Sequence, residues 1–148
     1  MDIYNFLPLS AQLLTSGMPT PEQLKSVSEA GVEVVINLAL PTSEGAVPNE
    51  TQLVDSLGMS YVGIPVNWDH PTRESLVEFM DTMDAHRESR ILVHCQANFR
   101  ATAFVTLYRI LRLGWTREQA FPDMNRIWNP KQHPIWDRFI EENLSDPR

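Results

Sequence analysis

Two short apolar runs, residues 34–36 and 91–93, constrain the fold of this chain more than any other feature. A strand with one face in water alternates apolar and polar residues, whereas an unbroken apolar run is typical of a strand covered on both faces. Segments with helical spacing separate the predicted strands, and strands that alternate with helices form mostly parallel sheets. The sequence therefore predicts an α/β fold with a mostly parallel central sheet that is flanked by helices.

Local signals place the other elements. Thr20 and Thr116 each precede a glutamine by three residues, which is the pattern of a capping box, and Thr72 is suited to cap a third helix. We also expect strands at residues 3–9, 12–15 and 61–66, and helices at residues 50–57, 100–113 and 134–144.

The length of 148 residues is ordinary for one domain, and a hydrophobic content of 43% is enough for a sizeable core. No internal repeat or low-complexity linker divides the chain, so we predict a single domain over residues 1–148. Its last helix is expected to turn Ile135, Phe139 and Ile140 toward the core.

The composition excludes several classes of protein. No apolar run approaches the roughly 20 residues that cross a bilayer, and the N-terminus lacks the basic and apolar regions of a signal peptide. A single cysteine allows neither an internal disulfide nor a multi-cysteine zinc site. The net charge of -7 argues against nucleic acid. We therefore expect a cytoplasmic protein that binds neither nucleic acid nor a membrane; the sequence carries no signal of its oligomeric state.

Positive charge nevertheless gathers in one segment. Residues 95–128 contain five arginines and only two acidic residues, so a locally positive site is compatible with an acidic chain. The arginines are Arg100, Arg109, Arg112, Arg117 and Arg126. We expect most of them to be solvated on helices, with Arg100 as the exception.

The segment that carries the most chemistry starts where the second apolar run ends. His94 and Cys95 close the predicted strand, and Arg100 opens a long predicted helix. The loop between them consists of Gln96, Ala97, Asn98 and Phe99. In such a strand–loop–helix arrangement, backbone N–H groups and the helix N-terminus converge on one point, which forms an anion site.

The residue types in this loop suit that site. The converging N–H groups would favour the thiolate form of Cys95, and the planar fork of Arg100 could bind two oxygens of a phosphate or sulfate. Asn98 tolerates the left-handed backbone that a tight loop needs. A lone cysteine is most often a structural thiol, but the position of Cys95 before Arg100 favours a functional one. His94 is expected to orient the loop through hydrogen bonds rather than to act as an acid or base.

His94, Cys95 and Arg100 together resemble the signature loop of the cysteine-dependent protein tyrosine and dual-specificity phosphatases. Residues 14–21, 31–38 and 64–66 are similar to a bacterial branch of dual-specificity-like phosphatases. That branch includes the phosphatase-like domain attached to some β-lactamase-fold hydrolases. The resemblance covers roughly the first 115 residues.

The resemblance implies a mechanism without a metal or cofactor. Cys95 would attack phosphorus and form a phosphocysteine intermediate, while Arg100 and the backbone of Gln96 to Ala101 would hold the phosphate oxygens. Asp69, which follows a predicted strand, matches the aspartate that protonates the leaving oxygen; its alternative role is a helix cap ahead of Thr72. The substrate would be a phosphorylated small molecule or a phosphoprotein.

Two features of the loop keep other functions open. The phosphatase loop usually has five residues, commonly with a glycine, between cysteine and arginine, whereas four residues without glycine stand here. Four residues are also found in rhodanese-like sulfurtransferases, which would carry a persulfide on Cys95. Ala101 stands where a hydroxyl usually assists the departing thiolate, which predicts slow turnover. A non-catalytic phosphate-binding module and a purely structural cysteine are the remaining alternatives.

Overall fold

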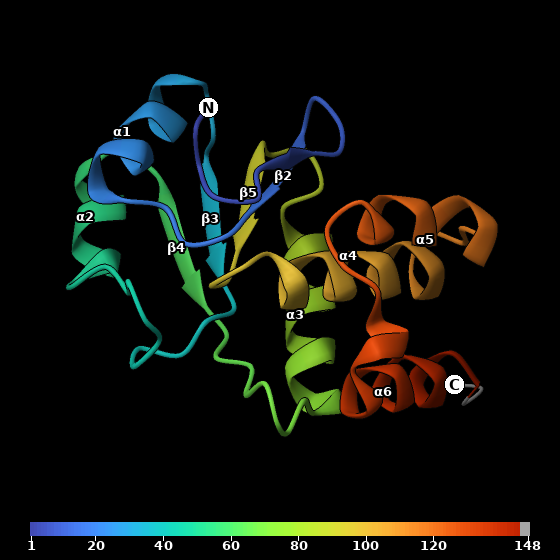
Figure 1. Cartoon of the computed structure of the whole chain (residues 1–148). Coiled ribbons are helices and arrows are strands. Elements are labelled where there is room, and N and C mark those ends of the chain that lie inside the picture. Colours follow the sequence, from blue (N-terminus) through green and yellow to red (C-terminus); the bar gives the residue numbers. More distant parts are fainter. Residues whose placement is uncertain (146–148) are drawn as a thin grey trace.

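The computed structural model of the chain describes residues 1–145 and builds them around a five-stranded sheet (Figure 1). The strands are β1 (Leu7–Pro8), β2 (Leu13–Ser16), β3 (Val34–Asn37), β4 (Ser60–Gly63) and β5 (Ile91–His94). They lie in the order β1-β2-β5-β3-β4, and only the β1–β2 pair is antiparallel. The predicted fold class is therefore confirmed, although β4 ends three residues earlier than expected.

Helices cover both faces of the sheet. They are α1 (Pro21–Glu29), α2 (Glu50–Ser56), α3 (Arg73–Ala85), α4 (Phe99–Leu111), α5 (Arg117–Asn125) and α6 (Pro134–Ser145), with a 3₁₀ turn, η1 (Pro130–Gln132). Both predicted capping boxes form, at Thr20 and at Thr116, and the Thr72 hydroxyl accepts from the backbone N–H of Ser75. In the described residues, no helix is long and apolar enough to cross a membrane.

Alternate residues of the central strands pack into two separate cores. Val34 and Ile36 of β3 face the layer formed by α3, α4 and α6, whereas Val35 packs with residues of α1 and α2. The two layers lie on opposite sides of the sheet in Figure 1. Because each central strand is covered on both faces, its residues are apolar without alternation.

Two expectations about individual side chains are wrong. Ile135 is 48% exposed, because α6 buries the larger indole of Trp136 together with Phe139 and Ile140. Arg109 is buried rather than solvated: its Nη1 donates to Asp123 Oδ2 at 2.8 Å, and its guanidinium lies 4.2 Å from the ring centroid of Trp115.

Asp84 ties α3 to α4, the helix that carries Arg100. Its carboxylate accepts from the Tyr108 hydroxyl at 2.9 Å and from the guanidinium groups of Arg87 and Arg112. Burial opposes ionisation, but the hydrogen bonds from Arg87, Tyr108 and Arg112 outweigh it and lower the pKa of Asp84. The ionised carboxylate is therefore part of what holds these two helices together.

We expect Asp84→Asn to lower the free energy of unfolding by about 1 kcal/mol at pH 7. Because the pKa of Asp84 is lowered by folding, its contribution is present above the pKa of an unfolded aspartate and is lost as the pH falls below it. Urea unfolding of wild type and variant at pH 7 and pH 3 checks this, with the exposed Asp55→Asn as the control. An equal difference in stability at both pH values would contradict the assignment.

Candidate active site

Cys95 lies at the carboxyl end of β5, the strand flanked by β2 and β3. Its side chain is fully buried, and its backbone N–H donates to Ser16 O at 3.4 Å. Because β2, β5 and β3 are parallel, the segments that follow all three strands start at the same edge of the sheet. This edge is where the loop from Cys95 to Arg100 forms.

The loop presents unpaired backbone donors. Asn98 has φ 67°, the left-handed conformation that the sequence predicted, and α4 begins at the next residue. Within residues 1–145, no backbone N–H from Gln96 to Ala101 donates a hydrogen bond to another residue. Unpaired N–H groups in a turn and at a helix N-terminus attract an anion, so this loop is a candidate anion cradle.

Arg100 supplies a buried positive charge at the same place. The residue is 7% exposed, and its Nη1 donates to Val66 O at 2.9 Å. None of the ion pairs in the described part of the chain includes Arg100. A buried guanidinium without a carboxylate is costly unless an anion neutralises it. The bond to Val66 also connects this side chain to the segment that leads to Asp69.

Asp69 lies in the exposed loop between β4 and α3. Its backbone N–H donates to Asn67 Oδ1 at 2.8 Å, and Asn67 and His70 form an isolated bridge. The helix-cap alternative for Asp69 is wrong, because Thr72 caps α3 itself. Among described residues, the Asp69 carboxylate has no hydrogen-bond or ion-pair partner, so it is available to an incoming group.

His94 forms a buried polar chain with Glu50 behind the loop. The His94 Nε2 lies 2.7 Å from Glu50 Oε2, and its Nδ1 lies 3.4 Å from Cys95 O. Glu50 Oε1 accepts from Asn37 Nδ2, which also donates to the Tyr61 hydroxyl. Burial raises the pKa of Tyr61; the Asn37 hydrogen bond opposes this shift and the Glu50 charge adds to it, so the hydroxyl stays protonated. This series of hydrogen bonds suits an orienting role for His94, and no sequence pattern pointed to Glu50.

The N-terminal segment clamps the cysteine loop from the other side. Asn5 Nδ2 donates to Ala97 O, and Asn98 Nδ2 donates back to Asn5 O, both at 2.9 Å. Asn98 Nδ2 also donates to Thr15 Oγ1 at 3.0 Å. Asn5, like Asn98, has a left-handed backbone. The two contacts of Asn5 join residues more than 90 positions apart, so no local sequence pattern reveals them.

Gly17 allows β2 to approach this loop. A Cβ atom at Gly17 would lie 2.7 Å from Gln96 O and 2.8 Å from the Tyr4 ring, which is too close for any side chain. The next residue, Met18, donates its backbone N–H to the same Gln96 carbonyl at 2.9 Å. The carbonyl of Gln96 is thereby bound by the segment that follows β2, which ties the loop to the end of that strand.

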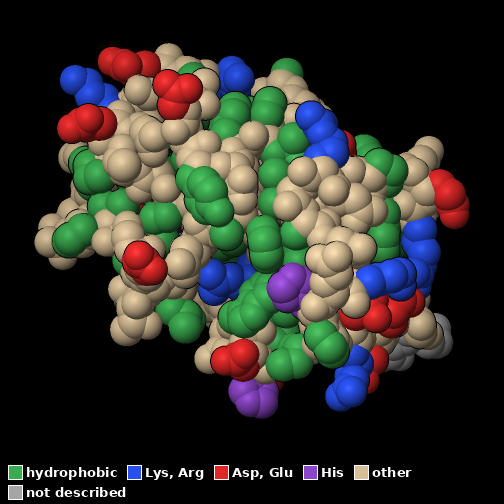
Figure 2. All heavy atoms as spheres, in the orientation of Figure 1, with side chains coloured by type: hydrophobic (Ala, Val, Ile, Leu, Met, Phe, Trp, Pro, Cys, Tyr) green, Lys and Arg blue, Asp and Glu red, His purple; other side chains and the backbone are tan. Residues whose placement is uncertain are grey.

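Aromatic residues from the C-terminal third support both loops. Trp136 Nε1 donates to Trp68 O at 2.8 Å, and the Trp68 ring stacks on it with centroids 5.4 Å apart. Trp128 stacks on Phe99 at 4.8 Å and donates from Nε1 to Thr102 Oγ1 at 3.0 Å. Figure 2 shows hydrophobic side chains gathered around a basic side chain and a histidine near the middle of this face. The sequence did not predict these contacts. They connect Trp68, next to Asp69, and Phe99, next to Arg100, to one aromatic cluster.

The chain matches a known protein family. The family model described as "DSP-PTPase phosphatase fused to NAD+ Kinase" matches residues 7–135. The chain belongs to this family. It is thus a member of the cysteine-dependent dual-specificity phosphatase superfamily, as its signature loop predicted. No curated protein matches the chain.

Solved structures place the phosphatase fold of this chain among known ones. A candidate phosphatase (DUF442) from Shewanella putrefaciens CN-32 is 37% identical, with a TM-score of 0.85 over 97% of this chain and 93% of that chain. P. aeruginosa TpbA in complex with phosphotyrosine is 17% identical, with a TM-score of 0.73 over 92% and 82%. The core catalytic domain of the PP-IP phosphatase SIW14 from S. cerevisiae is 19% identical, with a TM-score of 0.76 over 95% and 86%. The last two share the fold alone.

Proposed function

We propose that this phosphatase domain, residues 1–148, hydrolyses phosphomonoesters in the cytoplasm through a phosphocysteine intermediate on Cys95. The observation that carries the proposal is the buried guanidinium of Arg100, which has no carboxylate partner among the described residues, beside the free N–H groups of Gln96 to Ala101. Such a site is stabilised by a tetrahedral oxyanion. The family match adds the expectation that Cys95, at the start of the same loop, attacks the bound group.

The proposed reaction has two displacements at phosphorus. The Cys95 thiolate attacks phosphorus, the P–O bond to the leaving group breaks, and Asp69 donates a proton to the leaving oxygen. Water then attacks the phosphocysteine, Asp69 takes up a proton from that water, and the thiolate leaves with inorganic phosphate as the product. Arg100 and the loop N–H groups hold the phosphate oxygens in both steps. The chain's own side chains are sufficient for this balance, and no metal or cofactor is invoked.

The second displacement should be the slower one. Ala101 offers no hydroxyl to the departing thiolate, and the hydroxyl of Thr102 donates to Asn98 O at 2.7 Å and accepts from Trp128. Thr102 therefore does not substitute for the missing group. Phosphocysteine is expected to accumulate during turnover.

The proposed substrates are phosphorylated small molecules or phosphoproteins, with phosphotyrosine and phosphoserine or phosphothreonine as the residue types to test. TpbA was solved with phosphotyrosine, and SIW14 is a PP-IP phosphatase. The loop of this chain carries no lysine and no second arginine beside Arg100. Substrates with one phosphate suit it better than polyphosphorylated ones.

We expect Asp69→Asn to reduce kcat/KM, which reports the first displacement, by about 100-fold with phenyl phosphate and by much less with p-nitrophenyl phosphate. A good leaving group departs without a proton, so it depends less on an acid. Steady-state kinetics with both esters measure the difference, and the exposed Asp55→Asn serves as the control. An equal loss of kcat/KM on both esters would remove Asp69 from the acid role.

We expect Asn5→Ala to reduce kcat for p-nitrophenyl phosphate by about tenfold, because the loop loses the clamp that fixes Ala97 and Asn98. Asn5 touches no substrate, so it is a positioning residue. The rate of Cys95 alkylation by iodoacetate, followed against pH, should also change, and a merely structural defect would leave its pH profile unmoved. The exposed Asn125→Ala is the control; unchanged kinetics in Asn5→Ala would show that the clamp is dispensable.

The length of the loop supports a second candidate, a sulfurtransferase that carries a persulfide on Cys95. Four residues between Cys95 and Arg100 match the smaller cradle of that class. Assays with thiosulfate and cyanide separate the two candidates. The phosphatase proposal predicts hydrolysis of aryl phosphates in the presence of a chelator and no thiocyanate.

A further inference from the structure

A groove lies on the flank of the molecule between α3 and the outermost strand, β4. It has a volume of about 750 Å³, and its apolar floor includes Val62 of β4 with Val77 and Ala85 of α3. No residue of the loop from Cys95 to Ala101 lines it, so it is separate from the candidate active site. Its position beside a sheet edge raises the question of what it accommodates.

The strand beside the groove has a free edge. β4 pairs with β3 alone. The N–H groups of Ser60 and Ile64 donate to carbonyls of β3 and of the residue just before it. In a parallel ladder the intervening residues alternate in direction, so the N–H and C=O groups of Tyr61 and Gly63 point away from β3. In residues 1–145, none of these outward groups has a backbone partner. Such an edge is a template for an added strand.

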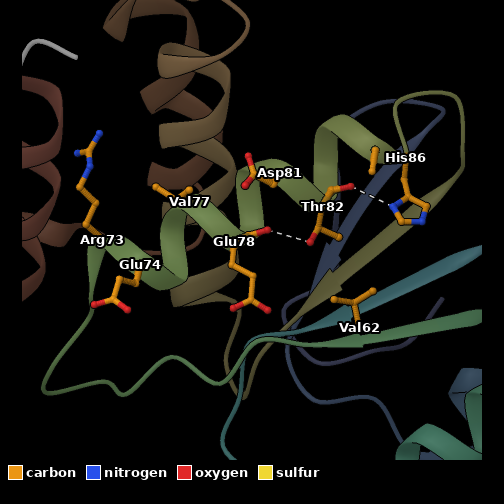
Figure 3. Close-up of a pocket in the computed structure, with 9 residues that line it drawn as sticks. Val62, Arg73, Glu74, Val77, Glu78, Asp81, Thr82 and His86 are labelled. Carbon is orange, nitrogen blue, oxygen red and sulfur yellow. Dashed lines mark hydrogen bonds between the residues drawn. The ribbon is translucent and has the colours of Figure 1, made fainter.

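The wall of the groove opposite β4 is acidic. Figure 3 shows Glu74 and Glu78 extending from the same side of α3, with Val62 on the neighbouring strand farther along the groove, toward Thr82. Neither glutamate belongs to an ion pair in the described part of the chain, and as like charges one turn apart they repel each other. Arg73 also lines the groove, but its Nη1 donates to Asn143 of α6 at 2.6 Å. Asn143 is neutral, so Arg73 keeps its charge, but the two glutamates outnumber it and leave the groove with a net negative charge.

We propose that the groove between α3 and β4 binds an extended, basic segment of a partner protein. The segment would pair its backbone with Tyr61 and Gly63, which extends the sheet by one strand. Alternate side chains would point into the groove, where a lysine or arginine meets Glu74 and Glu78 and an apolar residue covers Val62. The acidic side chains of the groove favour a basic segment. The free edge of β4 favours a segment in an extended conformation.

The test uses short capped peptides in which lysine and valine alternate with threonine, compared with the same peptides carrying glutamate for lysine. Fluorescence anisotropy at low and high salt measures affinity. The lysine peptide should bind and lose affinity with salt, and the double variant Glu74→Gln, Glu78→Gln should weaken it by about fivefold or more. The double variant Glu29→Gln, Glu88→Gln removes the same charge from exposed sites elsewhere and should bind like wild type.

The backbone part of the proposal is tested without altering the protein. Two sets of peptides are N-methylated at alternate residues, one set at the odd and the other at the even positions. Binding should be lost only in the set whose methylated N–H groups would face β4. Amide NMR should show the largest shifts at Tyr61, Val62 and Gly63. Equal binding of the glutamate peptide, unchanged affinity in the Glu74/Glu78 variant, or tolerance of N-methylation in both frames would overturn the proposal. The peptides carry no phosphate, so none of these results depends on the activity of Cys95.

Discussion

Cys95→Ser should abolish the hydrolysis of p-nitrophenyl phosphate, with kcat lower by about 10⁴-fold or more. The serine hydroxyl is close in size to the thiol, so the fully buried position keeps its packing. It is, however, far less ionised at neutral pH and a weaker nucleophile toward phosphorus. Initial rates between pH 5 and 8, in buffer with a chelator, measure the effect.

Phosphate binding by Cys95→Ser shows whether the variant has lost only its nucleophile or also its phosphate site. Because the cradle from Gln96 to Ala101 and the guanidinium of Arg100 remain, Cys95→Ser should still bind inorganic phosphate or an aryl phosphate ester. Calorimetric titration checks this binding, and circular dichroism checks the fold. If the wild type binds phosphate but neither protein hydrolyses the ester, the chain is a phosphate-binding module instead.

Arg100→Lys should reduce kcat/KM by roughly 100- to 1000-fold while the positive charge is kept. A guanidinium donates to two phosphate oxygens as a planar fork and still has N–H groups for Val66 O, whereas an ammonium is a compact point charge. The variant should therefore lose both the phosphate geometry and the link to the segment that carries Asp69. Steady-state kinetics and phosphate titration measure the two losses.

The matched control for this variant is Arg126→Lys, which changes an exposed arginine of the same charged segment. It should leave kcat/KM and phosphate binding unchanged. If Arg100→Lys also retained wild-type values, the buried guanidinium would be serving the fold alone, and the anion site would have to lie elsewhere.

Much of the fold was predictable because its signals are local. Strands covered on both faces appear as unbroken apolar runs, and capping boxes at Thr20 and Thr116 depend on residues three positions apart. The same holds for the centre of the site: Cys95 ends a buried strand, Asn98 takes the left-handed backbone, and α4 starts beside it. Local rules sufficed there, since strand, loop and helix are consecutive in the chain.

The surroundings of the site were not predictable, because they depend on tertiary contacts. Asn5 reaches Ala97 across most of the chain, and Glu50 meets His94 only after β3 and β5 have paired. The face of α6 was misjudged for the same reason: Trp136 is drawn inward by Trp68, a partner that its own helix does not reveal. The spacing of apolar residues predicts that a helix has an apolar face. It does not predict which aromatic partner that face contacts in the folded protein.

Trapping the intermediate tests the phosphocysteine mechanism most directly. Wild-type protein is mixed with excess p-nitrophenyl phosphate, quenched on the millisecond to second scale and digested, and the peptide containing Cys95 is analysed by mass spectrometry. We expect a phosphoryl group on Cys95 that accumulates before steady turnover, because Ala101 offers no hydroxyl to the departing thiolate and the second displacement is slow. Steady hydrolysis with an unmodified Cys95 at every time point, or with the phosphoryl group on another residue, would contradict it.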